Sequence, residues 1–156
     1  GSFLYSIDGK VLKIFGPDDN DALRLLNQFI EIRFVTGDKK GFAISEKRIS
    51  KDMGFKLDLV STIKRIDWIS HKFILSETIY MGDGIFDHLV MKNVGYAISP
   101  ANADNNAKKF SNYVTKRSGA DRAVAEACMH IIKKFFKNIN PYNPSKNLKY
   151  SGEWTF

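Results

Sequence analysis

Short strand-forming stretches alternate with helical patterns along most of this chain, and this alternation restricts its possible folds more than any other feature. Strands are expected at about residues 30–35, 57–60, 78–81, 96–98 and 113–115, and helices at about 44–53, 63–70, 85–93, 105–110 and 120–137. A further helix is expected to begin at Asn20 or Asp21. Strands that alternate with helices form right-handed βαβ units. The sequence therefore predicts an α/β fold of Rossmann-like type, with a parallel sheet covered by helices on both faces.

The first fifteen residues predict a β-hairpin that precedes this sheet. Apolar and polar residues alternate on both sides of the dipeptide Asp8-Gly9. This dipeptide suits the positive φ angles of a tight type I′ turn. We therefore expect residues 1–15 to form a hairpin flap on the main domain.

The last nineteen residues differ in character from the rest of the chain. Residues 138–156 have little periodicity and contain two prolines, whereas residues 1–137 carry the alternating pattern. We therefore expect one domain over 1–137 and a tail over 138–156. The tail is predicted to pack on the body or on a neighbouring subunit through Trp154 and Phe156.

The composition is that of a single domain with its own hydrophobic core, since 44% of the 156 residues are hydrophobic. No apolar run is long enough to span a membrane. The one cysteine, Cys128, fits a reducing compartment, so a cytoplasmic protein is expected. The net charge is +7, but the lysines are scattered. They indicate a solvated surface with a modest preference for anionic substrates rather than a nucleic-acid partner.

Polar residues with related chemistry follow three of the expected strands. Thr36 and Gly37 close the first strand, Lys64 follows the second, and residues 82–87 (Gly-Asp-Gly-Ile-Phe-Asp) follow the third. A hydroxyl next to a glycine N–H can bind phosphate oxygens, and a lysine adds a mobile positive charge. Asp83 and Asp87 lie four residues apart and can face one hard cation. Because ligands of such sheets bind at the carboxyl ends of the strands, the sequence predicts a phosphate and magnesium site.

These residues, in this order, resemble motifs II, III and IV of the haloacid dehalogenase (HAD) superfamily. Within it the chain is most similar to the capless family of 3-deoxy-D-manno-octulosonate 8-phosphate phosphatases. The hairpin, residues 91–95 (Met-Lys-Asn-Val-Gly) and residues 113–115 (Tyr-Val-Thr) continue the likeness, which covers about residues 1–135. The resemblance implies a Mg2+-dependent phosphoric monoester hydrolase that works through an aspartyl-phosphate. It also implies a small phosphorylated anionic substrate, such as a sugar-acid phosphate, and commonly a homo-tetramer.

The resemblance also implies roles for individual residues. Thr36, Gly37 and Lys64 would bind the phosphoryl group, and Asp83 would ligate magnesium. Asp87 would orient the metal's surroundings or pair with Lys64. Thr36, Lys64 and Asp87 are therefore the expected catalytic residues.

Two positions near the expected site depart from the pattern of the superfamily. Asp38 follows Thr36-Gly37 where relatives often carry arginine, and Arg122 lies one position from the arginine that relatives use near the site. Both are candidate substrate-binding residues.

The nucleophile motif of the superfamily, Asp-x-Asp-Gly, is absent from the sequence. The nearest string is residues 6–9, Ser-Ile-Asp-Gly, which could be a degenerate copy with Ser6 in the nucleophile's place. We prefer the hairpin interpretation, because an alternating strand continues after Gly9. The aspartate is then expected upstream of residue 1, on a strand whose loss would expose two strand edges.

Three other functions are compatible with parts of the pattern. The missing nucleophile allows a catalytically silent domain with the same fold, used for oligomerisation or regulation. A phosphoacceptor receiver domain also uses Asp, Thr and Lys, but there the acidic cluster comes first. The net charge alone allows a nucleic-acid module. The shared motifs do not specify which phosphorylated substrate is used.

Overall fold

The computed structural model describes residues 2–142 of the chain. Its strands and helices follow the expected order. In chain order they are β1 (Phe3–Ser6), β2 (Gly9–Lys13), α1 (Asp19–Leu26), β3 (Arg33–Thr36), α2 (Phe42–Glu46), the π-helix η1 (Lys47–Asp52), β4 (Lys56–Leu59), α3 (Arg65–Ser70), the 3-10 helix η2 (Leu75–Glu77), β5 (Ile79–Met81), α4 (His88–Met91), β6 (Tyr96–Ser99), α5 (Asn105–Lys109), β7 (Tyr113–Val114) and α6 (Ala123–Phe135).

The five strands from β3 to β7 pair in parallel, as the alternation of strands and helices predicts. β3 pairs with β4, and β6 lies between β5 and β7. Within the described residues these strands form two separate sheets, one of two strands and one of three. β3 and β5 therefore each have one paired edge, and every residue of β3 is only half-buried.

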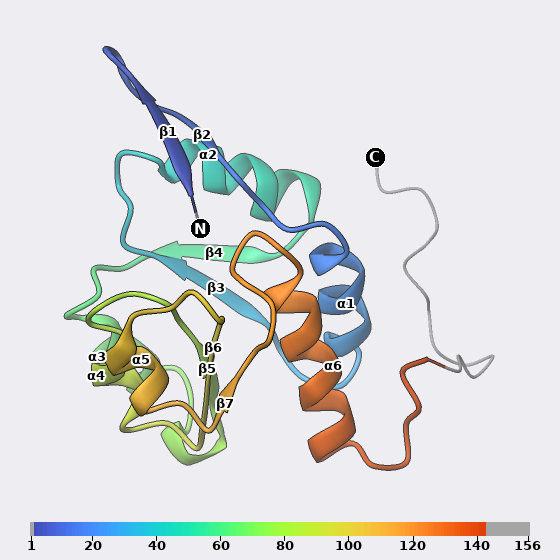
Figure 1. The fold of residues 1–156 in the computed structure, drawn as a ribbon. Coiled ribbons are helices and arrows are strands. Elements are labelled where there is room, and N and C mark those ends of the chain that lie inside the picture. The colour runs from blue at the N-terminus through green and yellow to red at the C-terminus, as the bar shows by residue number, and fades with distance from the viewer. Residues whose placement is uncertain (1, 143–156) are drawn as a thin grey trace.

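Helices cover both faces of the strands (Figure 1). Ile79 and Met81 of β5 pack against a core that includes buried residues of α1 and α6. Tyr80, between them, packs with buried residues of α3, α4 and α5. Because successive side chains of a strand point to opposite faces, this alternation confirms the Rossmann-like arrangement. Phe34 of β3 packs against the same core as Ile79, so the two sheets share one hydrophobic layer.

The expected hairpin is present and extends from the body above α2 (Figure 1). β1 and β2 are antiparallel, and Ser6 pairs with Gly9. The predicted turn type is wrong, since Ile7 and Asp8 occupy the turn and Asp8 does not have a positive φ. Gly9 alone takes a positive φ, of 120°. One glycine after an ordinary turn is sufficient to restore the strand direction, so Asp8 has no need of the left-handed region.

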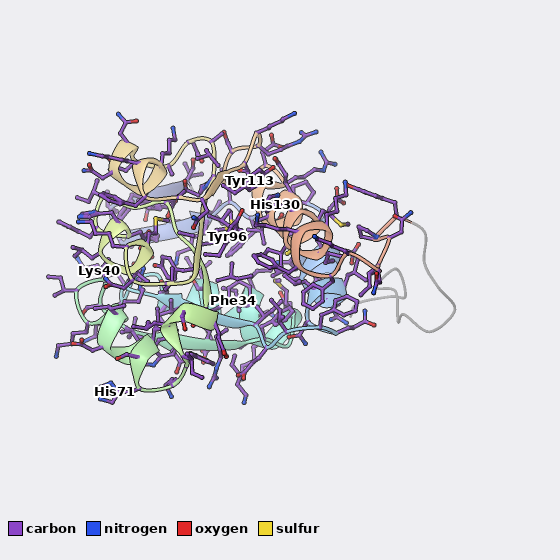
Figure 2. The ribbon with its side chains drawn as sticks, turned by 90° about the horizontal axis from the view of Figure 1, so that it is seen from below. Phe34, Lys40, His71, Tyr96, Tyr113 and His130 are labelled. Carbon is purple, nitrogen blue, oxygen red and sulfur yellow. The ribbon has the colours of Figure 1, made fainter. Side chains whose placement is uncertain are left out.

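Aromatic stacking attaches α6 to the three-stranded sheet (Figure 2). The rings of Tyr113 and His130 are parallel, with centroids 3.7 Å apart. The Tyr96 hydroxyl lies 2.8 Å from Nε2 of His130. Burial, helped by the charge of Lys134, lowers the pKa of His130. The neutral imidazole is therefore the form that fits this contact.

The hydrophobic core also contains the one cysteine. Cys128 is buried in α6, and its burial raises the pKa of the thiol to about 12. Within residues 2–142, none of the helices is both long and apolar enough to span a bilayer. Most of the predicted tail, including Trp154 and Phe156, lies outside the described residues.

Candidate functional site

The loop after β5 is held in shape by the carboxylate of Asp87. Oδ2 of Asp87 accepts hydrogen bonds from the backbone N–H groups of Asp83 and Gly84, both at 2.8 Å. A Cβ atom added at Gly82 would lie 2.6 Å from Cγ and Oδ2 of Asp87, so only glycine fits beside this carboxylate. The loop leaves Asp83 exposed just beyond the end of β5.

The second oxygen of Asp87 belongs to a buried ion pair. Oδ1 accepts hydrogen bonds from the Tyr80 hydroxyl at 2.6 Å and from Nη1 of Arg65 at 2.8 Å. The side chains of Arg65 and Asp87 are 9% and 7% exposed. Burial, followed by the negative charge of Asp87, raises the pKa of Tyr80 far above its ordinary value. Tyr80 therefore remains a neutral hydrogen-bond donor.

Both carboxylate oxygens of Asp87 thus have protein partners, and its ion pair is with Arg65. The sequence predicted that Asp87 would either orient the metal's surroundings or pair with Lys64. In the structure, Lys64 is the exposed N-cap residue of α3, and Arg65 is the first buried residue of that helix. Arg65 is the residue that the sequence analysis missed. Arg65 lies four residues before the buried Ile69 on α3, and this spacing indicates the same helix face. Arginine side chains are mostly exposed, however, so burial of Arg65 was not expected.

Loops that follow three different strands meet at the guanidinium of Arg65. A Cβ atom added at Gly37, after β3, would lie 3.5 Å from Nη2 of Arg65 and 3.5 Å from Oγ1 of Thr62. Thr62 follows β4, and Asp87 follows β5. The structure therefore brings the Thr36-Gly37 loop and the loop after β5 to one place. Such a place, at the carboxyl ends of parallel strands, is where ligands of α/β sheets bind.

Asp38 connects the loop after β3 to the hairpin. Its Oδ2 lies 2.5 Å from Nζ of Lys10 and 2.8 Å from Nζ of Lys13. Its Oδ1 accepts the N–H of Gly41, and its own N–H donates to Oγ1 of Thr36. The two ammonium groups hold the pKa of Asp38 far below its ordinary value. The carboxylate that was expected to contact substrate therefore attaches the hairpin to the Thr36 loop.

Arg122 lies at the start of α6. It is the N-cap of α6, with a φ of 62°, and its Nε is 2.5 Å from Oδ2 of Asp18, just before α1. This ion pair joins the start of α6 to the segment before α1. The role of Arg122 in substrate binding stays a prediction.

The carboxylates of the site can supply only part of a metal's coordination. Among residues 2–142, no group of three or more His, Cys, Asp or Glu side chains is placed to hold a metal ion. Asp83 is an exposed residue, and both carboxylate oxygens of Asp87 accept hydrogen bonds within the protein. Mg2+ commonly takes one or two protein carboxylates and completes its shell with water and substrate phosphate. Asp83 fits that limited role.

The sequence matches no family model and no curated protein, but the fold matches solved structures. One is 3-deoxy-D-manno-octulosonate 8-phosphate phosphatase from Moraxella catarrhalis, in complex with magnesium, phosphate and KDO. It is 25% identical with a TM-score of 0.72, over 85% of this chain and 78% of that one. A Vibrio cholerae protein proposed to be the same phosphatase is 29% identical with a TM-score of 0.72, over 85% and 76%. The cobalt-bound phosphatase from Haemophilus influenzae is 21% identical with a TM-score of 0.71, over 85% and 80%.

Proposed function

We propose that this chain, which has the fold of the HAD-superfamily phosphatases, is a Mg2+-dependent phosphoric monoester hydrolase. Its substrate would be a sugar-acid phosphate or a similar small anionic metabolite. The observation that supports this most strongly is the meeting of the Thr36-Gly37 loop and the Asp83 loop at one buried guanidinium. Phosphoryl transfer depends mainly on such positioning and on neutralisation of charge.

The residues of these loops have complementary roles in the proposal. The hydroxyl of Thr36 and the N–H of Gly37 bind phosphoryl oxygens, and Lys64 at the start of α3 adds positive charge. Asp83 holds the metal ion, which neutralises charge on the phosphoryl group when it is bound. Asp87 keeps the backbone of the Asp83 loop in place through its hydrogen bonds to two N–H groups.

The nucleophilic aspartate is proposed to lie on a strand that precedes residue 1 and pairs between β3 and β5. Two observations support this position. β3 and β5 each have an unpaired edge within residues 2–142, and Phe34 and Ile79, one from each strand, pack against the same core. The aspartate carboxylate would form a bond to phosphorus as the ester P–O bond breaks and the leaving alcohol takes a proton. Water would then release inorganic phosphate and free the carboxylate.

The hairpin is proposed to pack on other subunits of a homo-tetramer. Its exposed apolar side chains lie on both strands, in the turn between them and on the segment after them: Phe3, Leu4, Tyr5, Ile7, Val11, Leu12, Ile14 and Phe15. A two-stranded ribbon gains little stability alone, so such side chains need a surface to cover them. Light scattering on the eluting protein tests the assembly, and a monomer at micromolar concentration would contradict it. A cytoplasmic location is part of the same proposal.

The proposed activity is tested by phosphate release from a panel of monoesters with the protein of the complete reading frame. We expect turnover with magnesium, loss of turnover with a chelator, and faster turnover of phosphorylated sugar acids than of the matching neutral sugar phosphates. No phosphate release from any monoester, with folded protein and magnesium present, would refute the proposal and leave the silent-domain alternative.

A further inference from the structure

Two lysines of β2 share one carboxylate. Nζ of Lys10 lies 2.5 Å and Nζ of Lys13 lies 2.8 Å from the same oxygen of Asp38. The side chains of the two lysines are 5% and 14% exposed, so both are largely removed from water. Among residues 2–142, no second carboxylate pairs with either lysine. The cluster therefore contains two positive charges against one negative charge.

The excess positive charge is best accessible to a ligand at Lys13. A charge removed from water is costly unless an opposite charge accompanies it. The ring of Phe3 compensates Lys10 in part, because Nζ of Lys10 lies 3.9 Å from the ring centroid. Lys13 donates to Oγ of Ser45 and pairs with Asp38. Because an ammonium group has three N–H donors, one donor of Lys13 has no acceptor among the described residues.

The cluster lies next to the proposed phosphate-binding loop. The backbone N–H of Asp38 donates to Oγ1 of Thr36 at 3.2 Å, and Gly37 lies between them in the chain. Consecutive Cα atoms are about 3.8 Å apart, so the Cα atoms of Thr36 and Asp38 are within roughly 8 Å of each other. One small substrate can therefore reach both the loop and the lysines.

The size of the excess charge indicates a carboxylate rather than a second phosphate. A carboxylate carries one negative charge and neutralises the cluster, whereas a phosphate monoester carries about −1.5 to −2 at neutral pH. Lysine binds either group as a point charge. The phosphoryl group, however, already has the Thr36-Gly37 loop as its proposed site.

We infer that Lys13, supported by Lys10 and oriented by Asp38, binds the carboxylate of a phosphorylated sugar acid and so selects this substrate class. The phosphoryl group then lies at the Thr36-Gly37 loop and the carboxylate lies at Lys13. This inference rests on the proposed function. It assigns the choice of substrate to the hairpin, whereas the motif residues bind only the phosphoryl group and the metal.

The test compares two ligands that differ at one carbon: 6-phosphogluconate, and sorbitol 6-phosphate, which carries a hydroxymethyl group in place of the carboxylate. Binding is measured by calorimetry with the protein of the complete reading frame. We expect 6-phosphogluconate to bind about tenfold more tightly or more, as is usual for a hydrogen bond to a charged group. Lys13→Met should reduce this ratio to less than about threefold. Lys51→Met, a change of an exposed lysine on η1, should leave the ratio as it is.

Three results would overturn the inference. The first is equal affinity of the unmodified protein for the two ligands, and the second is an unchanged ratio in Lys13→Met. The third is an equal loss of affinity for both ligands in Lys13→Met, because that result would show that Lys13 only holds the hairpin in place.

A second measurement needs no substitution. The Cε–H resonance of Lys13 in 13C-labelled protein, assigned through the backbone, should shift as 6-phosphogluconate is added and should shift less with sorbitol 6-phosphate. Equal shifts with the two ligands would contradict a carboxylate at Lys13.

Phosphate release from the same two ligands separates this inference from the proposed function. Protein that prefers 6-phosphogluconate through Lys13 but releases no phosphate from any monoester would refute the function and support the inference. Protein that releases phosphate from both ligands with the same kcat/KM would support the hydrolase activity and refute the inference.

Discussion

Removing the Asp87 carboxylate is expected to destabilise the fold strongly, because four donors depend on it. Asp87→Ala leaves the guanidinium of Arg65 buried without its partner ion, the Tyr80 hydroxyl without an acceptor, and two loop N–H groups unpaired. Breaking a buried ion pair by removal of one partner costs about 3–5 kcal/mol. For a chain of this size, that loss lowers the melting temperature by roughly 6–20 °C.

Urea unfolding followed by tryptophan fluorescence measures this loss of stability. Asp67→Ala is the matched control, since Asp67 is an exposed aspartate on α3 and should change stability by less than about 0.5 kcal/mol. The double variant Arg65→Met, Asp87→Leu removes both charges and should be less destabilised than the sum of the two single changes. If Asp87→Ala costs less than about 1 kcal/mol, the buried ion pair does not stabilise the site as we describe.

Three further predictions follow from contacts at the site and at α6. A Cβ atom in Gly82→Ala would lie against the Asp87 carboxylate, whereas the atom nearest to a Cβ at Gly84 would be 3.4 Å away. Gly82→Ala should therefore weaken phosphate binding, measured by calorimetry, and Gly84→Ala should not. The pKa of Asp38 is lowered in the folded state, so its carboxylate stabilises the fold at pH above its ordinary pKa of 3.8. This stabilisation is lost as pH falls below about 4. Asp38→Asn should therefore lose less stability on acidification than the unmodified protein, and its hairpin should be cut faster by protease at neutral pH. The pKa of His130 is lowered in the folded state, so the unfolded state binds a proton first as pH falls below 6.5, and stability should decrease from there to more acidic pH. Thermal melts of His130→Phe across this pH range should lack that decrease. An unchanged decrease in the variant would show that another group causes it.

The order of the elements was predictable from the sequence because hydrophobic periodicity records which faces are buried. Strand β5 is an example. Ile79 and Met81 pack against one hydrophobic cluster, and Tyr80 between them packs in the other. Element boundaries agree unevenly: α6 (Ala123–Phe135) lies inside the predicted range of 120–137, whereas the helix predicted over 85–93 forms only at His88–Met91. Periodicity carries no information on turn geometry, so the type I′ turn at Asp8 was wrongly predicted.

The partners of the charged residues could not be predicted from spacing along the chain. Asp38 was predicted to contact substrate, which stays a prediction, but its ion pairs with Lys10 and Lys13, 28 and 25 positions away, could not be foreseen. The motif pattern selects Lys64. Which of Lys64 and Arg65 is buried depends on how α3 is oriented relative to the sheet, and in the structure it is Arg65. Such choices depend on tertiary contacts, which a single sequence does not contain.

The most direct test of the account is the rate of phosphate release by Asp83→Ala, measured with the complete reading frame, saturating magnesium and the best monoester from the panel. Asp67→Ala serves as the matched control. The account predicts that Asp83→Ala folds normally and loses activity by about a hundredfold or more, while Asp67→Ala keeps full activity. Full activity in folded Asp83→Ala protein would contradict the claim that the loop after β5 forms a phosphatase site.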